Sequence, residues 1–72
     1  MNSNEFLIGF GERIRIKRLE LGFSAAEFSQ KIGISEKLLH KIESGEKDIK
    51  VEIFYEIKKV LGASFEYLLG EE

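Results

Sequence analysis

Short groups of apolar residues recur at helical spacing along this 72-residue chain, glycines are scattered between them, and proline is absent. This pattern predicts an all-α fold. The first helix is expected from about Asn4 to Leu21, with Gly22 as its C-cap. Gly9 and Gly11 weaken its first turns by up to ~1 kcal/mol each, so a start nearer Gly11 is the alternative. Its inward stripe is predicted to be Phe6, Phe10, Ile14 and Leu21.

Residues 22–45 read GFSAAEFSQKIGISEKLLHKIESG and predict two short helices, at about 25–32 and 36–44. Ser24 and Glu27 fit a capping box, in which Ser24 accepts from the third helical N–H and Glu27 reaches back. Gly33 closes the first helix, and Ser35 offers an N-cap for the second. Two short helices joined by a glycine-containing turn predict a helix-turn-helix at about 24–44.

Two more helices are expected after a polar loop at 46–50, in which Asp48 is a candidate N-cap. The first covers about 50–61, and Ser64 caps the second, which holds Phe65, Leu68 and Leu69. The inward positions of the first are expected to be Ile53 or Phe54, Ile57 and Leu61. The pattern therefore predicts five short helices in one domain over residues 1–72, sharing one core.

The composition is that of a globular protein, with 43% hydrophobic and 33% charged residues. Cysteine is absent, which excludes disulfides and thiolate metal sites. His40 is the only histidine and has no recognisable partner ligands, so we expect no metal and no other cofactor. No apolar run approaches the roughly 20 residues that span a bilayer. The first residues lack the basic segment of a signal peptide, so a cytoplasmic location is expected.

The net charge of −2 argues mildly against a nucleic-acid partner, but the charges are unevenly distributed. Residues 13–50 carry nine lysines or arginines and six acids, whereas residues 51–72 carry two lysines and five acids. The positive excess coincides with the predicted helix-turn-helix. Screening confines surface fields to about 8–10 Å at physiological salt, so the local charge matters more than the total.

No pattern of catalytic residues is present, and an enzyme is not expected. Gly9-Phe10-Gly11 lacks the spacing and the preceding strand of a phosphate-binding loop. Serines at helix starts are explained as caps rather than nucleophiles. Tyr55 and Tyr67 occupy core-like or interface-like positions, of which a core role is the simpler interpretation.

Four segments, RIRIKRLELGFS, AEFSQKIGIS, LLHKIESG and VLGASFEYLL, occur in this order within residues 11–69. Together they resemble the XRE/Cro/CI family of helix-turn-helix DNA-binding domains, which includes lambdoid phage repressors and small bacterial regulators. The resemblance implies a compact five-helix, lambda-repressor-like fold. It also implies sequence-specific binding of double-stranded DNA by a repressor-type transcription regulator. A homodimer on a palindromic operator is implied as well, because one such domain contacts a half-site.

The resemblance places base reading on the third helix, which would enter the major groove. Lys37 and Lys41 lie four residues apart on one helical face and can donate to guanine O6 and N7, and Glu36 can accept from a cytosine amino group. The alternative is an ordinary solvated face. The predicted base-reading residues are Glu36, Lys37, His40 and Lys41.

The resemblance also implies phosphate contacts, an ion pair and a dimer surface. Arg18 is expected to pair with Glu43 in a structural contact, the alternative being an exposed pair worth ~0–1 kcal/mol. The phosphate candidates are Arg13, Arg15, Lys17, Ser24, Ala25, Lys31, Ser35, Ser44, Lys47 and Lys50, of which Ala25 offers only its backbone N–H. For any single basic side chain a merely solvated position is the alternative. The candidate dimer contacts are Phe65, Tyr67, Leu68 and Leu69.

Several residues depart from the family pattern. Ala25 lacks a side-chain phosphate donor, and Glu36 places an acid on the reading helix. Leu38 would contact a thymine methyl, meet a protein partner, or fold against Ile34. Lys58 stands where the family commonly has a small residue, and its stem can cover apolar surface. Ala25, Glu36 and Leu38, together with the acidic ends of the chain, motivate a competing hypothesis. It is a protein-interaction module that keeps the fold with weak or no DNA binding.

Overall fold

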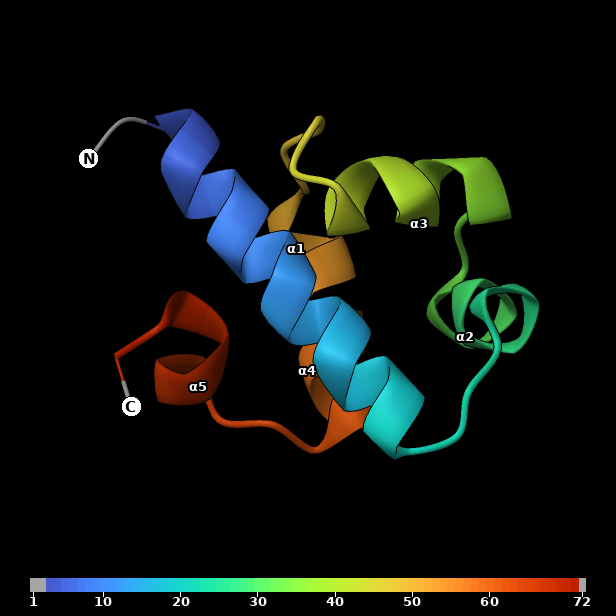
Figure 1. Ribbon diagram of the computed structural model, residues 1–72. Coiled ribbons are helices and arrows are strands. Elements are labelled where there is room, and N and C mark those ends of the chain that lie inside the picture. Colours follow the sequence, from blue (N-terminus) through green and yellow to red (C-terminus); the bar gives the residue numbers. More distant parts are fainter. Residues whose placement is uncertain (1–2, 72) are drawn as a thin grey trace.

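The computed structural model describes residues 3–71, and this range forms five helices and no strands. The helices are α1 (Ser3–Glu20), α2 (Ala25–Ile32), α3 (Glu36–Glu43), α4 (Val51–Leu61) and α5 (Phe65–Leu69). The long α1 crosses the middle of the molecule, with α2 and α3 on one side of it, α5 on the other side, and α4 behind (Figure 1). The predicted all-α, five-helix fold is confirmed.

Three serines fix the helix starts, as the sequence predicted. The hydroxyls of Ser24, Ser35 and Ser64 each accept a backbone N–H from three residues further on, at 3.0 Å. The Glu27 carboxylate also accepts from the Ser24 N–H at 3.0 Å, which completes the capping box. Asp48 was the wrong cap for α4: the N-cap is Lys50, two residues further on, and it makes no side-chain capping bond.

The first helix starts at Ser3, so the alternative start near Gly11 is wrong. Gly11 is buried inside α1, where a Cβ would collide with the backbone oxygens of Ile42 and Glu43 at the end of α3. The glycine therefore allows a close crossing of two helices rather than marking a helix end. This crossing sets the position of α3 against α1.

The core takes side chains from all five helices. The largest fully buried ones are Ile14, Phe28, Leu39, Ile42, Ile57 and Leu68. Burying each contributes roughly 1.5–3 kcal/mol. Ser29 on α2 is a small residue that is also buried. The predicted inward stripe is wrong at two positions, because Leu21 is 49% exposed and Phe6 is 36% exposed. Leu21 lies beyond the end of α1, where Gly22 adopts φ +81° and turns the chain away.

Candidate nucleic-acid interface

The turn between α2 and α3 is closed by its own backbone. Gly33 adopts φ +78°, in the left-handed region that glycine favours, and its N–H reaches back to the end of α2. The Ile34 N–H then donates to the Ser29 carbonyl at 3.0 Å, and Ser35 begins α3 as its N-cap. Three residues therefore reverse the chain and place α3 across α2 without a longer loop.

A buried ion pair holds the end of α3 against α1. Arg18 Nε and Nη2 donate to the two carboxylate oxygens of Glu43, at 2.7 and 3.1 Å, so the pair is bidentate. The third nitrogen, Nη1, donates to the Phe23 carbonyl at 2.9 Å, in the segment that leads into α2. Each residue is only 7% exposed. The predicted partners are thus in contact, and the pair is buried rather than solvated.

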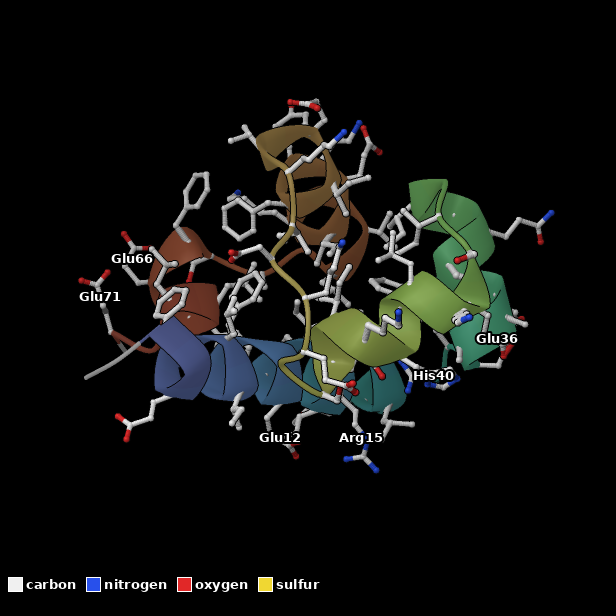
Figure 2. All side chains as sticks on the ribbon, turned by 90° about the horizontal axis from the view of Figure 1, so that it is seen from above. Glu12, Arg15, Glu36, His40, Glu66 and Glu71 are labelled. Carbon is white, nitrogen blue, oxygen red and sulfur yellow. The ribbon has the colours of Figure 1, made fainter. Side chains whose placement is uncertain are left out.

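The outer face of α3 carries the predicted base-reading residues. Glu36, Lys37, His40 and Lys41 are all exposed, whereas Leu39 and Ile42 on the inner face are buried. Glu36 lies at the end of α3 near α2, and His40 lies on the side of α3 toward α1 (Figure 2). Lys37 and Lys41 occupy the neighbouring face, because residues four apart align along a helix.

Lysines from α3 and from the following loop meet on one surface. A shallow hollow of about 280 Å³ is lined by Ser35, Lys37, Leu38, Lys41 and Lys47. None of the ion pairs formed within residues 3–71 involves Lys37, Lys41 or Lys47. The three ammonium groups therefore share a surface with no acid neutralising them by direct contact. We call this surface, lined by Ser35, Lys37, Leu38, Lys41 and Lys47, the lysine face.

The other phosphate candidates near the helix-turn-helix differ in what they can offer. Lys50 is exposed, and Lys31 is exposed with its ammonium 5.6 Å from the centre of the Phe23 ring. Ala25 is half-buried against the core. Because its side chain has no polar atom, it can offer a phosphate only its backbone N–H. The Ser44 hydroxyl lies 3.1 Å from the Lys41 carbonyl and 2.6 Å from a Glu46 carboxylate oxygen, so its single proton is already used.

Two of the candidates on α1 lie on the wrong side of the helix. Gly11, which contacts α3, and Arg13 are about 200° apart around α1. Arg13 is half-buried and its Nε donates to the Leu68 carbonyl of α5 at 2.9 Å. Lys17, one turn further on, lies 5.4 Å from the centre of the Tyr67 ring in α5. The structure therefore does not bring Arg13 and Lys17 to the lysine face.

Arg15 lies on the outer side of α1. It is exposed and pairs with Glu12 at 3.6 Å, and both side chains point away from the body of the molecule (Figure 2). In the same view, Glu66 and Glu71 project from the α5 region at the left. The acidic segment 51–72 thus places side chains on α5, whereas the positive segment 13–50 is divided between the lysine face and the α5 contacts of Arg13 and Lys17.

The predicted dimer contacts separate into exposed and buried residues. Leu68 is fully buried, so its side chain belongs to the core and its prediction as a contact is corrected. Phe65 and Leu69 are 47% and 38% exposed. Phe65 ends a row of packed aromatic rings that continues through Phe54 and Phe10 to Phe6. The Lys58 ammonium lies 4.8 Å from the centre of the Phe65 ring, so its side chain covers part of this row.

Sequence reasoning missed some of the exposed apolar surface. Tyr55, for which a core role was the simpler interpretation, is 55% exposed, and Val51 is 77% exposed. Both belong to α4, whose buried side chains are Ile57 and Leu61. Apolar residues are spread through the α4 sequence VEIFYEIKKVL, so their spacing alone did not tell these outer positions from the inner ones.

Residues 14–68 match the family model described as "Helix-turn-helix". The match spans most of the chain, so the chain belongs to this helix-turn-helix family, and the resemblance drawn from the sequence is confirmed. The fold and the family together define a DNA-binding domain of the transcription-regulator class, which is not an enzyme class.

Two solved structures have the same fold. The restriction-modification controller protein C.AhdI from Aeromonas hydrophila superimposes with a TM-score of 0.79 and 21% identity, covering 86% of this chain and 94% of that one. An HTH_3 family transcriptional regulator from Vibrio cholerae gives a TM-score of 0.83 and 24% identity over 99% of this chain. This chain spans 40% of the length of the Vibrio cholerae protein. At these identities the similarity concerns the fold.

Two further properties bear on the class of site. None of the helices in residues 3–71 combines the length and apolarity needed to cross a bilayer. Within the same range, the histidine and the acidic residues form no group of three or more that could hold a metal ion.

Proposed function

We propose that this domain recognises a specific duplex sequence by inserting α3 into the major groove, and that it represses transcription as a homodimer on a palindromic operator. The lysine face is the observation that carries the proposal. Its ammonium groups are exposed and unpaired at the outer side of α3, although the whole chain is acidic. Helix-turn-helix domains use positively charged surfaces of this kind to bind DNA, which is a polyanion.

Base reading is assigned to the exposed side chains at the start and middle of α3. Lys37 and Lys41 would donate to guanine O6 and N7, and Glu36 would accept from a cytosine amino group. Each well-formed contact of this kind is worth about 1–3 kcal/mol of discrimination against a wrong base. His40, on the side of α3 toward α1, would border the groove rather than lie at its centre.

Phosphate contacts are assigned to the loop lysines and to the starts of the two helices. Lys47 and Lys50 are exposed next to α3. The first N–H groups of α2, from Ala25 on, and those of α3, after Ser35, would donate to phosphate oxygens, assisted by the helix dipoles. Arg15 and Lys31 are peripheral candidates. Arg13 and Lys17 are assigned to the α1–α5 contact instead.

The dimer is assigned to the surface around α5. Phe65, Leu69 and Phe6 present apolar area there, and a shallow hollow of about 200 Å³ lies beside Phe6, Phe10, Phe54 and Leu69. A two-fold pairing of this surface would carry two copies of α3 on one side of a duplex, which matches a palindromic site. The repressor role rests on the resemblance to phage repressors. A regulator of this kind would act in the cytoplasm of a prokaryotic cell.

Salt-dependent duplex binding tests the proposal. The logarithm of the affinity should fall linearly with the logarithm of the salt concentration. Lys47→Ala should reduce the slope by about 1.8, which is about 0.9 for each of the two subunits. The matched control is Lys59→Ala, because Lys59 lies on α4 and pairs with Glu56 at 3.2 Å. No binding to any duplex at low salt would overturn the proposal.

The competing hypothesis is a protein-interaction module, and Leu38 is the residue that favours it. Leu38 is apolar and half-buried at the edge of the lysine face. If Lys37→Ala and Lys41→Ala change nothing while Leu38→Ala disrupts a complex with a protein partner, this function replaces DNA binding.

A further inference from the structure

Two apolar hollows lie on either side of the loop between α3 and α4. The first, which we call the α3–α4 hollow, measures about 330 Å³ and has apolar walls formed by Leu38, Ile42, Ile49 and Ile53. The second is the hollow of about 200 Å³ at Phe6 and Leu69, which we call the α1–α5 hollow. Asp48 and Ile49 line both. The two sites therefore share a wall and differ in what surrounds them.

The difference is charge. Lys47 and Lys50 line the α3–α4 hollow, whereas Asp48 is the only charged residue that lines the α1–α5 hollow. The α3–α4 hollow also adjoins the lysine face, because Leu38 and Lys47 line both. Lys37 and Lys41 thus stand beside the same apolar floor. Two lysines and one aspartate line the α3–α4 hollow itself, and two more lysines line the adjoining lysine face. None of the four lysines joins an ion pair within residues 3–71.

An apolar floor with a positive rim is complementary to a particular kind of molecule. Its volume of about 330 Å³ falls at the lower end of ligand pockets, which measure about 300–1,000 Å³. An aliphatic or aromatic chain would gain from covering Leu38, Ile42 and Ile53. A carboxylate at the end of that chain would be attracted by the lysines, and the exposed Asp48 carboxylate would repel a carboxylate placed at the shared wall.

We propose that the α3–α4 hollow binds a small amphipathic anion, such as a medium-chain carboxylate, and that this anion releases the domain from DNA. The second part rests on the proposed function, because Lys37, Lys41 and Lys47 are the assigned DNA contacts. A carboxylate held among these lysines neutralises charge that phosphates would otherwise meet. Binding of the anion and binding of DNA therefore oppose each other, and each weakens the other by the same factor.

The first experiment measures binding without DNA, by methyl NMR of the whole chain titrated with octanoate. Saturable shifts are expected at Leu38, Ile42 and Ile53, and much smaller shifts at Leu7 and Leu69 in the α1–α5 hollow. Butyrate, whose chain is shorter, and octylammonium, whose charge is reversed, should bind at least tenfold more weakly. Lys50→Glu should weaken octanoate about tenfold, whereas Lys59→Glu, which makes the same change of charge away from both hollows, should leave its affinity within about twofold.

Several results would overturn the site. They are equal shifts in both hollows, octylammonium binding as well as octanoate, and equal weakening by Lys50→Glu and Lys59→Glu. The release step is tested separately, by adding octanoate to the domain bound to its selected duplex. A rise in the apparent Kd for DNA with octanoate, absent with butyrate, is expected, and an unchanged Kd overturns the release step. If no duplex binds at all, the proposed function and the release step fail together, whereas the DNA-free titration still decides the site.

Discussion

The helix-turn-helix at α2–α3 and the α1–α5 contact are built by different kinds of interaction. In the first, the capping bonds and the Gly33 turn join residues no more than a few positions apart. In the second, Arg13 donates to the Leu68 carbonyl across 55 positions, and the aromatic row joins three helices. Hydrogen bonds between near neighbours determine the helix-turn-helix, whereas tertiary packing determines the surface assigned to the dimer. Substitutions should affect the two regions by different amounts.

The largest loss of stability is expected at the Arg18–Glu43 pair, which joins the helix-turn-helix to α1. Arg18→Met leaves the buried Glu43 carboxylate unpaired and should lower the free energy of unfolding by about 3–5 kcal/mol. Urea denaturation measures this change. The control is Arg15→Met, since Arg15 belongs to an exposed pair worth less than about 1 kcal/mol. Equal losses in the two variants would show that burial of the Arg18–Glu43 pair does not matter.

Gly11 tests the close crossing of α1 with α3. Gly11→Ala places a methyl against the backbone oxygens of Ile42 and Glu43, so we expect a loss of about 3 kcal/mol. Gly9→Ala is the matched control two residues away, where the new methyl meets only the end of the Arg13 side chain, at 3.2 Å. Its effect should stay within about 1 kcal/mol, because alanine also favours the helix. A Gly11→Ala variant as stable as the wild type would contradict this packing.

Arg13 tests whether the α1–α5 contact is structural. Arg13→Met removes the bond to the Leu68 carbonyl and should cost about 1–2 kcal/mol. At constant salt, the DNA affinity of the folded variant should remain close to that of the wild type. Stability can be followed by thermal denaturation and affinity by fluorescence anisotropy. If the variant has normal stability but binds DNA more weakly, Arg13 contacts phosphate and does not stabilise the α1–α5 contact.

Glu27 gives the smallest expected effect, and it depends on pH. The backbone N–H of Ser24, and then its hydroxyl, lower the pKa of Glu27 below its ordinary value of 4.5. A carboxylate with a lowered pKa in the folded state stabilises the fold above pH 4.5, and this stabilisation is lost as the pH falls through the folded pKa. Glu27→Gln keeps an acceptor for the Ser24 N–H but cannot titrate. Denaturation between pH 2 and 7 should therefore show a shallower acid loss for Glu27→Gln than for the wild type.

The same contrast explains how far the sequence could predict the structure. Ser24, Ser35, Ser64 and Gly33 act on their near neighbours, so their caps and turn could be read from the chain. The fold class and the five helices followed from these signals and from apolar spacing. The apolar spacing did not reveal that the first helix ends before Leu21, at the turn formed with Gly22, so that Leu21 is exposed.

The candidate site was predictable in outline only. Exposure of the basic residues on α3 followed from their place opposite Leu39 and Ile42. The roles of Arg13 and Leu68 depend on where α5 docks, which no local signal encodes. The grouping of Lys47 with Lys37 and Lys41 depends in the same way on the path of the loop after α3. Long-range packing therefore decides which basic side chains belong to one surface.

Selection of bound duplexes from a random pool, with the wild type and with Lys37→Ala in parallel, tests the central claim most directly. The wild type should select a palindromic site whose half-sites contain a guanine. Lys37→Ala should lose about 1–3 kcal/mol of preference at one position of each half-site and keep the rest of the sequence. If no sequence is enriched over the starting pool, or if both proteins select the same site with the same preference, α3 does not read DNA as proposed.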